Sequence, residues 1–380
     1  MKKIGIVTII DYNNYGNRLQ NYALYKTVLS LGYECETILN FPGQKNIIER
    51  LRNKSIKDLI SFLHDKFSSR EKTNYKIQNY EHQRLLNSRI RKMKDFSKQH
   101  LGESIFTVQN DIFPSQYINN YDAFIVGSDQ VWNPFYRNVG TVDFLKFAKK
   151  NQRISYAASF GVSEIPQNYK KKLSVGLAGI SHISVREKTG VSLVQELSNK
   201  QANVHVDPTL LLSSKDWLKL SKPCNVIPQR KYLLRFFVGE MTNEYARHTQ
   251  YIADKHDLVI LELNNPEQAE AYVIDPSEFI SCINSASIIC TDSFHGSVFS
   301  IIFNKPFIVY ERSGSKENMN SRIDTLLETF GLKDNRKTNT VKRINFSDKQ
   351  LLHVKRIIEE ERSRSIDYLK ISLSDSFSKS

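Results

Sequence analysis

The chain has 380 residues, of which 40% are hydrophobic and 25% are charged. These proportions are typical of a soluble globular protein, and the length suits two domains better than one. No run of about 18 apolar residues occurs, so we expect no membrane-spanning helix. The four cysteines are scattered and form no CxxC pair, which predicts buried free thiols in a reducing compartment and no metal site. We therefore expect a cytoplasmic protein.

The net charge of +14 is concentrated in one segment. Residues 51–100 contain 13 Lys and Arg but only 5 Asp and Glu. This segment predicts basic amphipathic helices, and it lacks the interleaved aromatics and zinc-finger spacing of a nucleic-acid-binding protein. Two interpretations are open for the insertion at about residues 45–105. It is either a solvated helical addition or a surface that is attracted to an anionic membrane or to an anionic lipid-linked substrate.

Short apolar strands and amphipathic helices alternate through the first 165 residues. The N-terminal strand imitates a signal peptide, but it stops at Asp11 without a small-residue cleavage site. A helix follows and ends at Gly32. This alternation predicts a first α/β domain, residues 1–165, with a parallel sheet. The predicted strands are 3–10, 33–40, 121–129 and 153–161.

A second alternating series predicts another α/β domain at residues 166–345. Residues 346–380 predict a charged helix with a frayed end. In two doubly wound domains, ligands bind at the carboxyl ends of the strands, in the cleft between the domains. The predicted strands of the second domain are 182–188, 204–212, 231–239, 258–263, 286–292 and 306–312, with helices at 191–197 and after His295.

The stretch TDSFHGS, residues 291–297, places polar residues where a buried strand gives way to an apolar helix. Ser293 is suited to cap that helix, and the free N–H groups of a helix start attract an anion such as phosphate. Gly296 permits close approach of a ligand or of backbone. His295 then lies beside an anion site, where it can donate a proton. The alternative is a packed histidine without a role.

Other strand ends carry polar residues as well. Asp129 ends a strand in a glycine turn, so it is either a catalytic base or a turn former. Asn17 and Gln20 follow the first strand, where they contact a sugar or only satisfy the turn. Asp207 begins an Asp-Pro pair, which is an ordinary turn signal, and we interpret it as structural.

The ordered blocks GSDQVW, SVREK, VDPTLL and SFHGS, followed by NSRIDTLLETFGL, resemble the polysaccharide pyruvyl transferase family from about residue 4 to about residue 335. The resemblance implies two Rossmann-like domains similar to a GT-B glycosyltransferase, with a C-terminal helix that crosses back. The basic insertion matches nothing in that family. The implied activity moves the pyruvyl group of phosphoenolpyruvate onto a sugar of a cell-surface polysaccharide precursor and leaves a pyruvate ketal.

The resemblance also implies roles for single residues. His295 matches the family's candidate general acid, and Arg186 matches a candidate donor-binding residue. Phosphoenolpyruvate is then the donor substrate, and the implied acceptor is a sugar, lipid-linked or free. No cofactor or metal is implied, and the donor is expected mainly on the second domain.

The chemistry of the donor supports these assignments. Its carboxylate and phosphate require guanidinium forks and helix amides, for which Arg186, Ser293 and Gly296 are suited. The helix start disfavours an imidazolium, so we expect His295 to become a competent acid mainly when the donor is bound. We expect Asp129 to act as the base.

One departure from the family concerns the donor contacts. Many members carry an arginine where this chain has Ser293. Another cation would then hold the phosphate, and the candidates are Lys305, Arg312 and Arg235.

Two other functions remain open. A GT-B type glycosyltransferase that uses a nucleotide sugar would share the architecture, because a fold does not fix a function. A non-catalytic protein would instead bind an anionic glycan or the membrane face through its basic helices, and this would place it at the inner face of the membrane.

Overall fold

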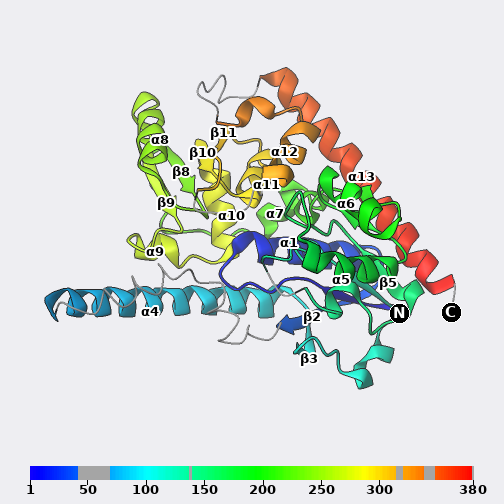
Figure 1. The fold of residues 1–380 in the computed structure, drawn as a ribbon. Helices are drawn as coiled ribbons and strands as arrows, with labels where there is room; N and C mark the ends of the chain where they lie inside the picture. The colour runs from blue at the N-terminus through cyan, green and yellow to red at the C-terminus, as the bar shows by residue number, and fades with distance from the viewer. Residues whose placement is uncertain (42–68, 137–138, 314–319, 338–346, 379–380) are drawn as a thin grey trace.

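The computed structural model describes residues 1–41, 69–136, 139–313, 320–337 and 347–378 (Figure 1). Strands and helices alternate along most of the described chain. The strands are β1 (Lys3–Val7), β2 (Glu34–Phe41), β3 (Glu103–Gln109), β4 (Ala123–Val126), β5 (Arg153–Ser155), β6 (Ser184–Val185), β7 (Asn203–Val204), β8 (Tyr232–Phe236), β9 (Val259–Leu263), β10 (Ile288–Thr291) and β11 (Phe307–Val309). The α-helices are α1 (Tyr15–Ser30), α4 (Ser69–His100), α5 (Gln167–Ala178), α6 (Lys188–Ser198), α7 (Ser214–Leu220), α8 (Asn243–Lys255), α9 (Ala269–Tyr272), α10 (Pro276–Ser285), α11 (Phe294–Ile302), α12 (Asn320–Thr329) and α13 (Asp348–Ser378). Short 3₁₀ helices are η1 (Ser115–Asn120), η2 (Val142–Phe144), η3 (Lys150–Gln152), η4 (Pro208–Leu211) and η5 (Lys333–Asn335).

The first sheet is parallel and has the order β3-β2-β1-β4-β5. Isolated parallel bridges join Ile154 to His182 and Ala158 to Val185, so the β6-β7 pair continues this sheet beyond β5. The combined order is that of a doubly wound nucleotide-binding fold. The second sheet is also parallel, with the order β11-β10-β8-β9.

The packing around the first sheet extends beyond the boundary that the sequence predicts. Leu173 and Leu177 of α5 and Val194 of α6 lie in one buried cluster with Val7 and Val126 of the first sheet. Residues 166–204 therefore belong to the first domain, and the predicted boundary at residue 165 lies inside it. Periodicity alone did not reveal this, because β6 and β7 are only two residues long.

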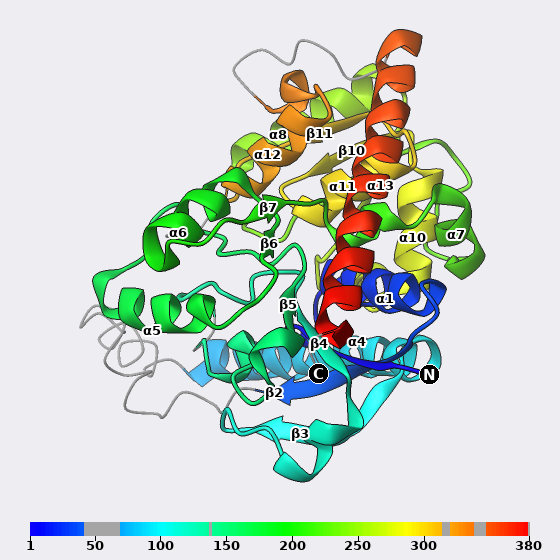
Figure 2. The same cartoon turned by 90° about the vertical axis from the view of Figure 1, so that its right-hand side faces the viewer.

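The long C-terminal helix α13 crosses from the second domain back to the first (Figure 2). Val354, near its start, packs into the core of the second domain. Leu369 and Leu373, near its end, pack against Ile4 and other residues of the first sheet. Burying each of these side chains contributes about 1.5–3 kcal/mol, so α13 ties the two domains together.

The helix α4 contains the end of the basic insertion. The side chains of its first eleven residues, and residues 42–68 before it, lie outside the described part. From there on, Met93 and Phe96 are buried in a cluster with Tyr15 of α1 and Phe279 of α10. The end of the insertion is therefore not a solvated addition, because it packs against both domains.

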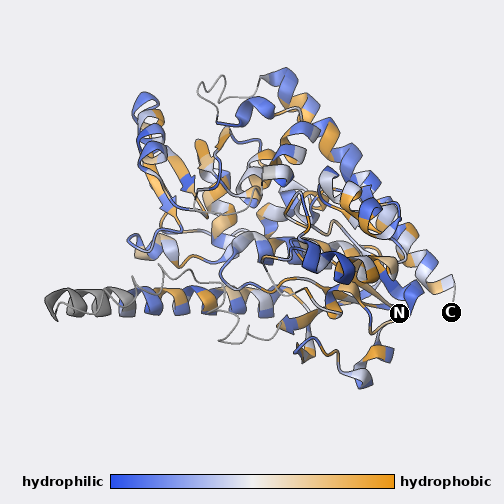
Figure 3. Cartoon of the chain, in the orientation of Figure 1, coloured by the Kyte–Doolittle hydropathy of each residue, from blue (hydrophilic) through white to orange (hydrophobic). Residues whose placement is uncertain are grey.

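The strands β8 and β9 consist mostly of hydrophobic residues, whereas hydrophilic and hydrophobic residues alternate along α13 (Figure 3). All four cysteines are buried and carry no disulfide, as expected. Within the described residues, no helix has both the length and the hydropathy that crossing a membrane requires.

Candidate active site

The candidate site lies where the carboxyl ends of β4, β6 and β10 face one another. Asp129 follows β4, Arg186 follows β6 and His295 follows β10. All three residues are buried, with exposed fractions of 8%, 4% and 7%. The sequence thus placed these residues correctly at strand ends, and the fold brings them together.

Asp129 lies in a turn that fixes its carboxylate. Its φ angle of 63° falls in the left-handed region, which aspartate tolerates better than most residues. The carboxylate accepts hydrogen bonds from the Gln130 backbone N–H at 2.9 Å and from the Asn17 side-chain amide at 2.8 Å. Two donors therefore hold it in one orientation.

Asn17 is itself held in position by its neighbours. Its side-chain oxygen accepts from Arg18 Nη2 at 2.6 Å and from the Asp11 backbone N–H at 2.9 Å, which leaves its amide nitrogen to donate to Asp129. Gln20 donates to Thr8 Oγ1 at 3.1 Å. Asn17 and Gln20 are both fully buried, so they organise the turn and do not contact a sugar in this conformation.

Arg186 connects two carboxylates. Its Nη1 lies 2.6 Å from Asp207 Oδ2, and its Nη2 lies 3.5 Å from Asp129 Oδ1. Asp207 also accepts from the Thr209 backbone N–H at 3.1 Å and thereby caps η4. Our interpretation of Asp207 as a turn residue is therefore incomplete, because its other oxygen faces the site.

His295 occupies the first turn of α11. Its Nε2 lies 3.6 Å from Asp207 Oδ2. The opposite side of the ring packs against Gly16 of α1, where an added Cβ would lie only 2.1 Å from Nδ1. The imidazole is therefore enclosed between a carboxylate and the first helix of the other domain.

The helix start around His295 is already partly satisfied. Ser293 caps α11, because its Oγ accepts from the Gly296 backbone N–H at 3.3 Å. Gly296 faces Thr291 and Phe236, and an added Cβ would lie 2.5 Å from Thr291 Oγ1. The sequence predicted that Gly296 permits the close approach either of a ligand or of the protein itself. The structure shows close packing against the protein.

The charges of the cluster shift the acidity of its members. Burial raises the pKa of the Asp129 carboxyl, but Arg186 and His295 outweigh burial and hold this pKa below its usual value. Burial likewise raises the pKa of Asp207, and His295 and Arg186 hold that pKa well below its usual value. Burial lowers the pKa of Arg186, but Asp207 and Asp129 raise it overall. Both carboxylates are therefore ionised and Arg186 is charged at neutral pH.

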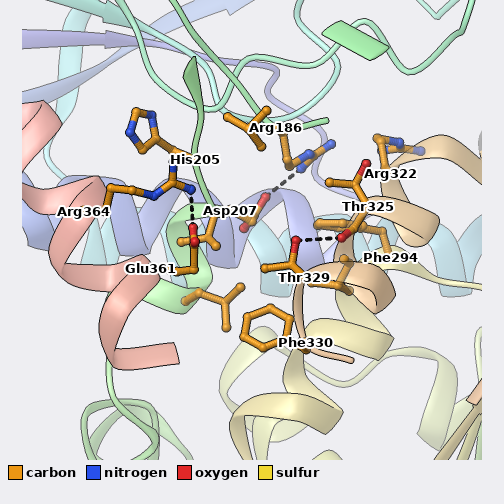
Figure 4. Close-up of a pocket in the computed structure, with 14 residues that line it drawn as sticks. Arg186, His205, Asp207, Phe294, Arg322, Thr325, Thr329, Phe330, Glu361 and Arg364 are labelled. Carbon is orange, nitrogen blue, oxygen red and sulfur yellow. Dashed lines mark hydrogen bonds and ion pairs between the residues drawn. The ribbon is translucent and has the colours of Figure 1, made fainter. Parts of the chain in front are cut away.

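Two cavities are lined by members of this cluster. Asp129 lines the first, a cleft of about 270 Å³ between the domains. Arg186 and Asp207 line the second, which measures about 40 Å³ and is bordered by α12 and α13 (Figure 4). The other residues that line the cleft between the domains are Asp11, Asn13, Asn14, Tyr15, Arg89, Gln130, Tyr136, Phe236, Val238, Asn264 and Arg312.

Three cationic residues were proposed to hold the phosphate in place of an arginine at the position of Ser293, and they lie in different parts of the structure. Lys305 follows the far end of α11, and its backbone N–H donates to Ser300, so it lies too far from the helix start to contact an anion there. Arg235 is engaged by Thr249 and by the carbonyl of Ala246. Only Arg312 lines the cleft, where its Nε lies 3.6 Å from Asp292 Oδ2.

Two arginines near the site were missed from the sequence. Arg322 of α12 is 5% exposed and lines the smaller cavity. Arg89 of α4 is 2% exposed and donates to the carbonyl oxygens of Tyr272 at 2.9 Å and Asn13 at 3.1 Å. Each lies on the apolar face of its helix. A charged residue among the apolar positions of a helix is the sequence feature that could have indicated a buried arginine.

No group of three or more potential metal ligands occurs among the residues that the structure describes. No curated protein matches the chain. Among solved structures, Arabidopsis thaliana UGT89C1 in complex with UDP-L-rhamnose is 10% identical, with a TM-score of 0.50, and the match covers 99% of this chain and 100% of that one. UDP-GlcNAc 2-epimerase from Neisseria meningitidis bound to UDP-GlcNAc is also 10% identical, with a TM-score of 0.44 and coverage of 99% and 94%.

These identities are too low to indicate more than the fold, and the first of the two matches supports the GT-B-like arrangement of two parallel-sheet domains that the sequence predicted. A family model described as polysaccharide pyruvyl transferase matches residues 14–314, which is most of the chain. The matched range includes Asp129, Arg186 and His295, and so the chain belongs to the polysaccharide pyruvyl transferase family.

Proposed function

We propose that this protein transfers the pyruvyl group of phosphoenolpyruvate to two hydroxyls of a sugar in a polysaccharide precursor. The methylene carbon of the donor gains a proton, and the carbon that bears the phosphate becomes cationic. One sugar hydroxyl attacks that carbon and loses its proton. The second hydroxyl then attacks the same carbon, the carbon–phosphate oxygen bond breaks, and inorganic phosphate leaves with the remaining proton. The products are a cyclic pyruvate ketal and phosphate.

The position of His295 carries this proposal. An acid that protonates carbon must be held in a fixed position, and the Asp207 carboxylate lies 3.6 Å from His295 Nε2. Gly16 leaves room for the ring on its other side, so the imidazole is held in one place. Such an enclosed pair of imidazole and carboxylate is better suited to proton donation than to packing alone.

Arg186 is suited to bind the anionic donor. Although its guanidinium is buried, its Nε makes no hydrogen bond to any described residue. A buried donor without a partner costs about 1–3 kcal/mol, and an incoming carboxylate or phosphate oxygen would satisfy it. Because Arg186 follows β6 of the first domain and His295 belongs to the second, the proposed donor contacts come from both domains.

The cleft between the domains suits a sugar acceptor. It is lined by amide side chains that can bond to hydroxyls, including Asn13 and Gln130, and by the aromatic rings of Tyr15 and Phe236. Asp129 lies at the boundary between this cleft and the donor cations, and its lowered pKa keeps it ionised. We therefore assign it the role of base for the attacking hydroxyl.

The predicted attraction to an anionic membrane depends on the basic residues of 51–100, and the side chains of residues 51–79 lie outside the described part. It stays a prediction, as does the lipid-linked form of the acceptor and the location of the protein at the inner face of the membrane.

Calorimetric titration of the purified protein with phosphoenolpyruvate, and separately with UDP-sugars, tests the proposal without knowledge of the acceptor. We expect binding of phosphoenolpyruvate that is lost in Arg186→Ala and that persists, more weakly, in His295→Ala. Binding of a UDP-sugar without any binding of phosphoenolpyruvate would instead indicate a glycosyltransferase.

A further inference from the structure

We propose that Arg322 binds the carboxylate of the donor together with Arg186. This inference rests on the proposed function, because it assumes an anionic donor at the Arg186 site. It assigns a binding role to a residue that lies outside the matched range of the family model, which ends at residue 314.

The two guanidinium groups lie around one aromatic ring. The Cζ atom of Arg186 is 4.5 Å from the centre of the Phe294 ring, and the Cζ atom of Arg322 is 5.8 Å from it. Phe294 directly precedes His295 at the start of α11. Figure 4 shows both arginines and Phe294 at the same side of the smaller cavity. Asp207 also lines this cavity, and its Oδ2 lies 3.6 Å from His295 Nε2, so a group bound there lies close to the proposed acid.

The size of this cavity decides which part of the donor it accepts. At about 40 Å³ it has room for about three water molecules, which is comparable to a planar carboxylate but not to a whole donor molecule. Thr325 adds a hydroxyl to its lining. The remainder of the donor would then extend past Arg186 toward His295 and Asp129.

The electrostatics of the two arginines favour an anion between them. Burial, and after it the neighbouring Arg186, lowers the pKa of Arg322 to about 9, although Asp129 and Glu187 oppose this shift. The guanidinium is still protonated at neutral pH, so two cations are held close together away from water. A carboxylate bound between them would reduce the repulsion of one guanidinium by the other.

The charge of Arg186 alone does not suffice for the donor. It is shared with Asp207 at 2.6 Å and with Asp129 at 3.5 Å. A donor with both a carboxylate and a phosphate therefore requires a further cation beside Arg186. The other arginine that lines this cavity, Arg364, belongs to α13, and its side chain is about half-exposed, whereas Arg322 is buried.

The test compares the phosphoenolpyruvate affinity of wild type, Arg322→Gln, Arg322→Lys and Arg364→Gln by calorimetry. Arg364→Gln is the matched control, because it removes a guanidinium from the same cavity but from a surface pair. We expect roughly ten- to hundred-fold weaker binding in Arg322→Gln, the range for losing a hydrogen bond to a charged group. Arg322→Lys keeps the charge but loses the planar fork, so its affinity should be intermediate.

The outcomes separate this inference from the proposed function. If wild type does not bind phosphoenolpyruvate, the proposed function fails. If wild type binds and Arg322→Gln binds within about two-fold of it, Arg322 has no part in binding and the inference is overturned. An equal loss in Arg364→Gln also overturns it, because the effect would then be one of general charge. Should Arg322→Gln not fold, the lysine variant decides: weaker binding supports the inference, and unchanged binding overturns it.

Discussion

Replacing Gly16 by alanine should displace His295 while leaving the fold intact. The added Cβ would lie 2.1 Å from His295 Nδ1 and 2.2 Å from its Cγ, whereas ordinary contacts begin at 3.4 Å. The ring must therefore move by about 1 Å, and a displacement of that size at a reacting group costs about a hundred-fold in rate. Overpacking costs about 1–3 kcal/mol of stability, and the better helix propensity of alanine returns up to about 1 kcal/mol.

The chain offers a matched control for this variant. Gly176 of α5 also packs against a ring, and its added Cβ would lie 2.4 Å from Phe144 Cγ. Phe144 and α5 belong to the core of the first domain and not to the site. Gly176→Ala should thus lose a similar amount of stability without the loss of rate.

The assay measures the free energy of unfolding in urea and the rate at which labelled phosphoenolpyruvate transfers its label to a sugar extract. We expect both variants to be folded at 25 °C, and only Gly16→Ala to be slow. A folded Gly16→Ala protein with the wild-type rate would refute the role of the enclosed His295. So would an equal loss of rate in Gly176→Ala.

Three further predictions concern buried ionisable groups. Burial, and then Arg364, lowers the pKa of His205 from 6.5 to about 4, so the unfolded chain binds more protons than the folded one between these pH values. The free energy of unfolding should therefore fall by about 3 kcal/mol as the pH falls through this window. Urea unfolding of His205→Asn should show a smaller fall, and an equal dependence on pH in the two proteins would contradict the assignment. Asp207→Asn leaves Arg186 without its closest carboxylate and should lower the free energy of unfolding at pH 7 by about 3–5 kcal/mol in urea. The control Asp257→Asn, in an exposed ion pair, should lower it by less than about 1 kcal/mol. Similar losses in the two variants would argue against a buried ion pair. Arg89→Met removes hydrogen bonds that reach both domains and should lower the free energy of unfolding by roughly 2–4 kcal/mol. The control Arg84→Met, on the exposed face of α4, should change it by less than about 0.5 kcal/mol. Unchanged stability in Arg89→Met would show that α4 does not join the domains.

The alternation of strands and helices was sufficient to predict two parallel α/β domains and to place Asp129, Arg186 and His295 at strand ends. Strand ends of a parallel sheet share one edge, so their convergence follows from the fold class. The catalytic and binding roles of these residues stay predictions, because geometry alone does not test them.

Other features depend on contacts between distant segments and were not predicted. The continuation of the first sheet through β6 and β7 rests on single bridges, which leave almost no periodic signal. The packing of Gly16 against His295 joins residues far apart in the chain. Lys305 lies beyond the end of α11 that is opposite His295, so it does not reach the helix start.

The most direct test of the account follows the pyruvyl group itself. Phosphoenolpyruvate labelled with carbon-13 would be incubated with the protein and an extract of lipid-linked and nucleotide-linked sugars, and the products analysed by mass spectrometry. We expect a sugar whose mass has increased by one labelled pyruvate less one water, with equimolar release of phosphate, and no such product with His295→Ala. Phosphoenolpyruvate that stays unconsumed while a UDP-sugar is transferred to the same extract would contradict it.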